Sequence, residues 1–166
     1  LDPTELPALV SEYRVGNATD DQLTADLSAL GYPGFSHYKP ARRGRNPADV
    51  LLSGLLADQR DARLVEAMPW VALRVYEMDW PALVAAAKLY DLQNRLGFVA
   101  TLAKQMAEQN SNGPAARKLR SVELALENSR LAKEGTLCNE KMTNAERRWL
   151  AANGTEAAMH WNLLSD

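Results

Sequence analysis

The sequence has 166 residues, a length that suits one domain with a sizeable apolar core. Hydrophobic residues make up 46% and charged residues 24%, as in globular proteins, and the formal net charge of −2 argues against a surface devoted wholly to nucleic acid. The single cysteine excludes an internal disulfide, and the presence of only two histidines argues against a Cys/His metal cluster.

Apolar residues recur at helical spacing along most of the chain, and no convincing alternation of apolar and polar residues indicates a strand. We therefore expect an all-α fold, a compact bundle of about seven helices. A further short helix is expected near Pro3. In chain order, the seven helices are expected at about 19–31, 47–58, 62–77, 80–109, 115–135, 144–153 and 155–164.

Residues that favour helix ends flank these segments. Gly31 is a good residue to end the first helix, and Thr143 with Glu146 has the spacing of a capping box. Pro69 should kink or split the helix that contains it. The expected N-caps are Thr19 or Asp20, Asn46, Asp79 and Thr143.

The segment at about 80–109 is the longest expected helix, and its apolar residues cover more than one face, so we place it at the centre of the bundle. Asp91 and Arg95 are four residues apart and could pair on one face. Gly97 would allow close approach of another backbone. A polar strip in the middle of this helix consists of Lys88, Asp91, Asn94 and Arg95. We interpret the strip as a buried network that fixes helix register, and the alternative is a recognition or active-site strip.

The irregular segment 32–46 concentrates positive charge just before an expected helix N-terminus. Its cations are Lys39, Arg42, Arg43 and Arg45. With Phe35 and Tyr38 available for stacking, this loop could hold phosphate, nucleic acid or an acidic protein surface, and a solvated loop without a ligand is the alternative. Trp161, in the last apolar helix, is a second candidate for a partner contact, because tryptophan is frequent at interface hot spots.

The chain contains no HExxH, P-loop, GxSxG or GxGxxG motif. A nucleophilic Cys138 would need a histidine and a third orienting group, and only His37 and His160 are available. We therefore assign no catalytic residue, expect no cofactor and no metal ion, and favour a non-enzymatic role.

Two blocks of sequence, residues 62–103 (ARLVEAMP…GFVATLA) and residues 131–164 (LAKEGTLC…MHWNLL), make up roughly half of the chain. They resemble bacterial helical proteins found beside nucleotidyltransferase-type toxins of the AbiEii class. The resemblance implies an antitoxin or transcriptional regulator of a toxin–antitoxin system, with a nearby toxin as partner. Such antitoxins often carry a DNA-binding segment at one end, and Leu1 as the first residue would fit the removal of an N-terminal segment.

We therefore expect one helical domain over 1–166 that acts as a non-enzymatic protein-interaction module, an antitoxin-like or regulatory subunit in the cytoplasm. The first alternative is a nucleic-acid-binding regulator that uses the basic loop at 39–45. The second is an unrecognised enzyme with a site in the polar strip at 91–95. We expect no membrane contact, because no apolar run is long enough to span a bilayer and no signal peptide opens the chain.

Overall fold

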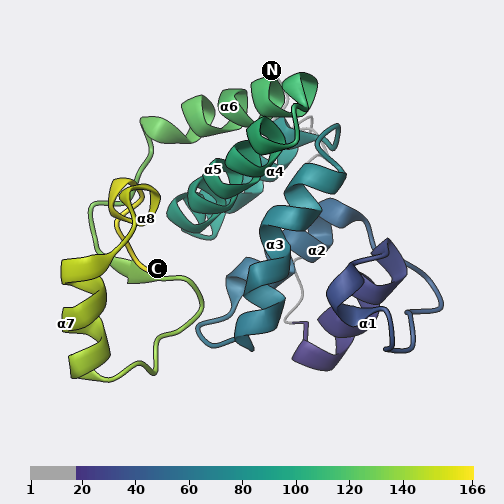
Figure 1. The fold of residues 1–166 in the computed structure, drawn as a ribbon, viewed down its shortest axis with the longest axis horizontal. Coiled ribbons are helices and arrows are strands. Elements are labelled where there is room, and N and C mark those ends of the chain that lie inside the picture. The colour runs from purple at the N-terminus through teal and green to yellow at the C-terminus, as the bar shows by residue number, and fades with distance from the viewer. Residues whose placement is uncertain (1–17) are drawn as a thin grey trace, which may run out of the picture.

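The structure, a computed structural model, describes residues 18–166 and is an all-α bundle, as the sequence predicts (Figure 1). The short helix expected near Pro3 lies outside these residues. The elements in chain order are α1 (Asp20–Leu30), the 3-10 turn η3 (Pro33–Phe35), α2 (Pro47–Leu56), α3 (Ala62–Arg74), α4 (Trp80–Leu89), α5 (Gln93–Gln109), α6 (Gly113–Glu127), β1 (Gly135–Thr136), α7 (Asn144–Asn153), α8 (Glu156–His160) and β2 (Leu163–Leu164).

The described helices other than α5 begin close to the predicted positions, and the predicted capping residues form the expected hydrogen bonds. Gln22 and Glu146 reach back to the N-cap backbone and complete two capping boxes. Gly31 ends α1 in the left-handed region, with φ +87°. The confirmed N-caps are Thr19, Asn46, Asp79 and Thr143.

Helix α5 lies inside the bundle and packs against α3, α4, α6 and α8. Viewed as in Figure 1, α1 and α7 lie at opposite ends of the molecule with α5 between them. Small residues on α5 allow its neighbours to approach closely. Its buried apolar residues are Leu96, Phe98, Val99, Ala100, Ala103 and Ala107.

The prediction of one long helix at about 80–109 is wrong, because the chain breaks between α4 and α5. Asp91 adopts the left-handed region, with φ +55°. The N–H of Leu92 then donates to the carbonyl oxygen of Ala87 (2.8 Å), and the N–H of Asp91 donates to the carbonyl oxygen of Lys88 (3.4 Å). These two hydrogen bonds are the pair that defines a Schellman C-cap. Leu92 is buried at this turn, so the apolar pattern continues through the break and hides it from the sequence.

The helix predicted at 115–135 ends early, at Glu127. The cause lies on α5, where the side chain of Asn94 takes the place of helical hydrogen bonds. Its Oδ1 accepts from the N–H of Leu131 (2.8 Å), and its Nδ2 donates to the carbonyl oxygen of Leu131 (3.0 Å). The chain is therefore held in an irregular path beside α5 after α6.

Two short parallel strands complete the described fold, with Gly135 paired to Leu163 and Thr136 paired to Leu164. Each strand is two residues long, too short for the alternation that identifies strands in a sequence. The last predicted helix, at 155–164, is therefore correct only over α8. In contrast, α3 continues through the proline that was expected to kink or split it, and the helix is not split.

Candidate functional site

The predicted polar strip does not form one network, because the break at Asp91 changes where its members lie. Lys88 and Asp91 are exposed, and neither bonds to Arg95 in the structure. Asn94 holds the chain after α6, as described above, while Arg95 contacts α2 and the loop after β1. The predicted pairing of Asp91 with Arg95 is therefore wrong, and the two partly or fully buried members hold different parts of the fold.

Arg95 joins α5 to the end of α2, to β1 and to the loop after β1. Its Nη1 donates to the carbonyl oxygens of Leu55 (2.7 Å) and Ala57 (2.9 Å), and its Nε donates to that of Thr136 (2.9 Å). Its Nη2 lies 3.5 Å from a carboxylate oxygen of Glu140. We call Arg95 with these four partners the Arg95 junction. The guanidinium of Arg95 already donates its hydrogen bonds to backbone oxygens. The polar strip therefore gives no support to a catalytic site.

Cys138 lies beside the Arg95 junction and is 1% exposed. Its sulfur is 3.6 Å from the carbonyl oxygens of Gly54 and Leu55, and Arg95 donates to it at 3.5 Å. Burial raises the pKa of the thiol above its ordinary value, and this effect exceeds the opposite influence of the nearby guanidinium. A buried, protonated thiol is a poor nucleophile, so this geometry does not support catalysis by Cys138.

Trp161 is part of the core and is 1% exposed, which corrects the expectation that it anchors a partner. Its ring lies over Gly97, where an added Cβ would come within 2.5 Å of the ring. The indole N–H donates to Thr101 Oγ1 (2.9 Å), and that hydroxyl donates to Glu123 (2.6 Å). Gly97 therefore allows a close contact as expected, but with a side chain instead of another backbone.

The basic loop at 39–45 contains one structural cation and three exposed ones. Arg45 pairs with the buried carboxylate of Asp26 (2.7 Å) and donates to Ser53, so it ties the loop to α1 and α2. Ser28 of α1 also donates to the backbone oxygen of Tyr38, the residue just before the loop (2.8 Å). The cations that stay exposed, without an ion pair or hydrogen bond to any other described residue, are Lys39, Arg42 and Arg43.

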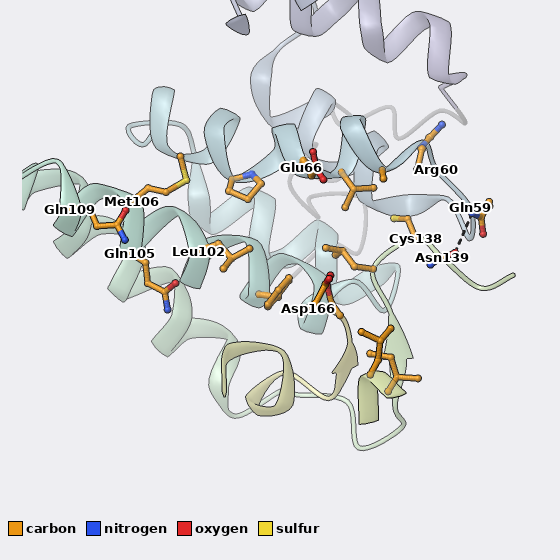
Figure 2. A pocket seen from close by; sticks show the side chains of 18 residues that line it. Gln59, Arg60, Glu66, Leu102, Gln105, Met106, Gln109, Cys138, Asn139 and Asp166 are labelled. Carbon is orange, nitrogen blue, oxygen red and sulfur yellow. Dashed lines mark hydrogen bonds between the residues drawn. The ribbon is translucent and has the colours of Figure 1, made fainter. Parts of the chain in front are cut away.

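A groove of about 630 Å³ lies between α3, α5 and the C-terminal segment (Figure 2). We call it the α3–α5 groove. Volumes of this order accommodate small ligands or the side chains of a docked segment. Among its apolar lining residues are Val65, Pro69, Leu102, Met106, Leu137 and Leu164. Its walls come from segments far apart in the chain, so no local sequence pattern could identify it.

The available charge at the α3–α5 groove is negative. Glu66 and Asp166 line it, and neither forms an ion pair with another residue between 18 and 166. Arg60 also lines the groove, but its side chain is 6% exposed. Its guanidinium donates to Asp20 and to two backbone carbonyl oxygens. The cation is therefore already compensated, whereas the two carboxylates are not.

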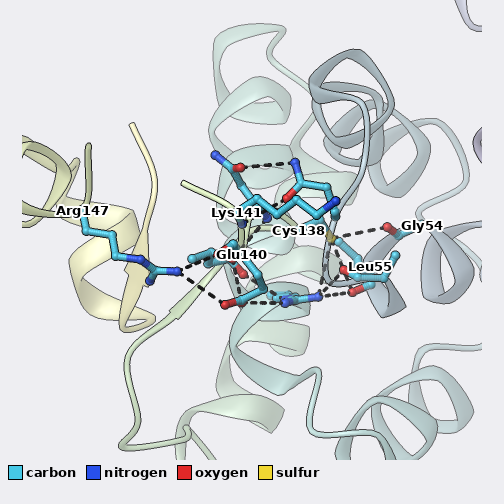
Figure 3. A network of polar contacts seen from close by, with 11 residues as sticks. Gly54, Leu55, Cys138, Glu140, Lys141 and Arg147 are labelled. Carbon is cyan, nitrogen blue, oxygen red and sulfur yellow. Dashed lines mark hydrogen bonds and ion pairs between the residues drawn. The ribbon is translucent and has the colours of Figure 1, made fainter. Parts of the chain in front are cut away.

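No residue of α7 is buried. Trp149 is 57% exposed on its surface, although tryptophan usually buries most of its area. The next residue, Leu150, lines the α3–α5 groove, and Arg147 donates to the backbone oxygen of Glu140 at 2.9 Å (Figure 3). The capping box predicts this helix, but nothing in the sequence shows which way Trp149 faces.

Other features of the described chain add contacts but no further site. No three His, Cys, Asp or Glu side chains within residues 18–166 are grouped as metal ligands would be. Glu127 and His160 bond at 2.8 Å beside a depression of about 390 Å³ and link α6 to α8. None of the helices described is both long and apolar enough to cross a bilayer.

The fold and its surface features define a class of protein, an all-α bundle with an apolar groove and an anchored basic loop. Comparisons of the chain with protein-family models, with curated proteins and with solved structures find no match.

Proposed function

We propose that this chain is a non-enzymatic protein-interaction module, an antitoxin-like or regulatory subunit that acts in the bacterial cytoplasm. The observation that carries the proposal is the α3–α5 groove, an apolar hollow between two neighbouring helices in which Leu102 and Met106 stay partly exposed. Trp149 adds an exposed side chain of the type that dominates interface energetics. The resemblance to proteins beside AbiEii-class toxins favours an antitoxin over other interaction proteins.

Co-purification with the product of the neighbouring gene tests this function. We expect the full chain to retain that partner, and we expect Leu102→Glu to weaken binding by about tenfold or more, because it places a charge in the apolar groove. Leu124→Glu is the matched control, since Leu124 is 61% exposed on α6 and does not line the groove. Absence of a partner, or equal weakening by both changes, would contradict the proposal.

A nucleic-acid-binding regulator is the second candidate, favoured by the three exposed cations on an anchored loop. The double change Arg42→Ala with Arg43→Ala should weaken binding to a labelled oligonucleotide. It should also flatten the salt dependence of binding, because a complex with fewer phosphate contacts releases fewer counterions when it forms. Arg117→Ala, an exposed arginine on α6, is the control. Arg45 is unsuitable for this test because it holds the loop in place. Binding that is absent, or that does not respond to salt, would reject this candidate.

A further inference from the structure

The residues of α3 and α5 that line the α3–α5 groove recur at the intervals typical of a surface on which another helix packs. On α5 they are Phe98, Leu102, Met106 and Gln109, at positions i, i+4, i+8 and i+11. On α3 they are Ala62, Val65 and Pro69, at i, i+3 and i+7. Residues at these intervals share one face of a helix. Phe98, Val65 and Pro69 are buried and form the floor of the groove. The partly exposed Leu102 and Met106 and the exposed Gln109 leave a seat on this floor for a third helix.

The length of the seat sets the length of its occupant. From 98 to 109 the α5 face extends about 16 Å, at 1.5 Å per residue, which matches about three turns of a docked helix. Met106 adds a flexible side chain that can adapt to different apolar anchors. The exposed side-chain amide of Gln105 can bond polar groups that flank those anchors.

The charge at the groove determines which charge on a docked helix is favoured. Glu66 lies on α3 beside the apolar Val65, and Asp166 belongs to the C-terminal wall (Figure 2). Arg60 does not offset these carboxylates, because Asp20 and two carbonyl oxygens already bind its guanidinium. The remaining field is negative, so it attracts a helix with cationic side chains and repels an acidic one.

We propose that the α3–α5 groove binds one basic amphipathic helix of a partner protein. Its apolar anchors, at i, i+4 and i+7, fill the groove above Leu102 and Met106, and a lysine or arginine beside them faces Glu66. This inference rests on the proposed interaction function and narrows the partner to a chain that offers such a helix. The arrangement is the helix-in-groove mode of recognition.

Three labelled synthetic peptides of about three turns probe the groove in the full chain. The first places leucine at helical spacing and lysine elsewhere, the second replaces each lysine by glutamate, and the third scrambles the first. Fluorescence anisotropy measures their dissociation constants. We expect the helical lysine peptide to bind about tenfold more tightly than either of the others, a difference of about 1.4 kcal/mol.

Glu66→Lys separates charge recognition from general apolar binding. Glu66 is exposed, so the change preserves the fold, and together with Asp166 it brings the uncompensated charge at the groove from two negative charges to zero. We expect this variant to lose the preference for the lysine peptide over the glutamate peptide. Leu102→Glu should weaken binding of every helical peptide, whereas Leu124→Glu should leave all dissociation constants within about twofold of wild type, a difference of under 0.5 kcal/mol. Circular dichroism confirms that each variant is folded.

Equal binding of the helical and scrambled lysine peptides would overturn the inference, and so would an unchanged preference in Glu66→Lys. Binding that appears only after removal of residues 1–17 would assign the groove to that segment of the same chain. A dimer that Leu102→Glu dissociates would assign it to a second copy. If the neighbouring gene product binds through the groove but the lysine peptide does not, this inference fails while the proposed function stands.

Discussion

The ring of Trp161 packs directly over Gly97, which has no side chain. An added Cβ at residue 97 would lie 2.5 Å from the ring, and both residues are buried. Overpacking should cost about 3 kcal/mol, more than the roughly 1 kcal/mol that alanine gains in helix propensity. We therefore expect Gly97→Ala to lower the free energy of unfolding by about 2 kcal/mol, as measured by urea denaturation.

Gly113→Ala is the matched control for this steric argument. A Cβ at Gly113 meets only the flexible guanidinium end of Arg117, at 3.2 Å. This variant should be neutral or slightly stabilising, because the arginine can move aside. Combining Gly97→Ala with Trp161→Leu should give less than the sum of the two single losses, since the clash disappears with the ring. Equal stability of the two glycine variants would show that the ring has room to move.

Cys138 should make stability depend on pH in the alkaline range. Burial raises the pKa of its thiol in the folded protein above the unfolded value of about 8.5. Below that value both states keep the proton, so the contribution of the thiol is constant. Above it the unfolded chain releases the proton first, and the free energy of unfolding therefore falls as pH rises.

Urea unfolding of wild type and Cys138→Ala at about pH 7 and about pH 9.5 measures this effect, because the variant lacks the thiol but keeps every other titrating group. The stability advantage of wild type should shrink at the higher pH. A difference between the two proteins that stays constant with pH would mean that the thiol ionises equally easily in the folded state.

At the scale of the helix, α7 depends on its own capping box because it buries no residue. The hydroxyl of Thr143 accepts from the N–H of Glu146 (3.2 Å), and the Glu146 carboxylate accepts from the N–H of Thr143 (2.6 Å). We expect Thr143→Ala to cost about 1 kcal/mol of helix stability. Amide hydrogen exchange should accelerate in α7 while α5 stays protected, because the loss is local.

The same capping box lowers the pKa of Glu146, mainly through its hydrogen bond with the backbone of Thr143. The contribution of the carboxylate is therefore present above the unfolded pKa of about 4.3 and is lost as pH falls through the lower folded value. Thr143→Ala keeps the backbone N–H but loses the hydroxyl that orders the first turn, so an NMR titration of the Glu146 carboxyl should show its pKa returning part of the way toward the ordinary value. An unchanged pKa would show that the backbone hydrogen bond of Glu146 does not depend on the hydroxyl.

Helix starts with a side-chain cap were predictable from the sequence because capping is local chemistry, whereas the start of α5, which has no such cap, was missed. Asn46, Asp79 and Thr143 each act within three residues of their position, so a short stretch of sequence contains the whole signal. Helix ends were less predictable. The end of α6 depends on Asn94, a residue on another helix, and the break after α4 places Asp91 in a conformation that favours glycine.

At the scale of the molecule, the site was less predictable than the fold. The basic loop was recognised from its composition, but only the structure shows that Arg45 is bound to Asp26 while Arg42 stays exposed. Trp149 and Trp161 occupy similar sequence contexts and differ in exposure because of tertiary packing. The α3–α5 groove combines faces of two helices with a distant C-terminal segment, so its existence depends on how those elements pack.

The Arg95 junction connects the helical bundle to the segment at 129–166, which contains α7, α8 and both strands. Arg95→Leu would leave the carbonyl oxygens of Leu55, Ala57 and Thr136 without their guanidinium donor. An unsatisfied buried polar group costs about 1–3 kcal/mol. We therefore expect a loss of more than about 2 kcal/mol, with exchange protection falling first in the segment at 129–166 and only later in α5 and α6.

Arg147→Leu tests whether this loss is specific to the junction. Arg147 also contacts Glu140: it donates to the backbone oxygen at 2.9 Å and lies 3.7 Å from the carboxylate. Both side chains are partly exposed, so we expect a cost under about 1 kcal/mol. Limited proteolysis near 128–134 should cut Arg95→Leu faster than Arg147→Leu, because detachment of the C-terminal segment exposes that connection. Uniform loss of protection across both parts of Arg95→Leu would instead mean that the bundle and the C-terminal segment unfold as one cooperative unit.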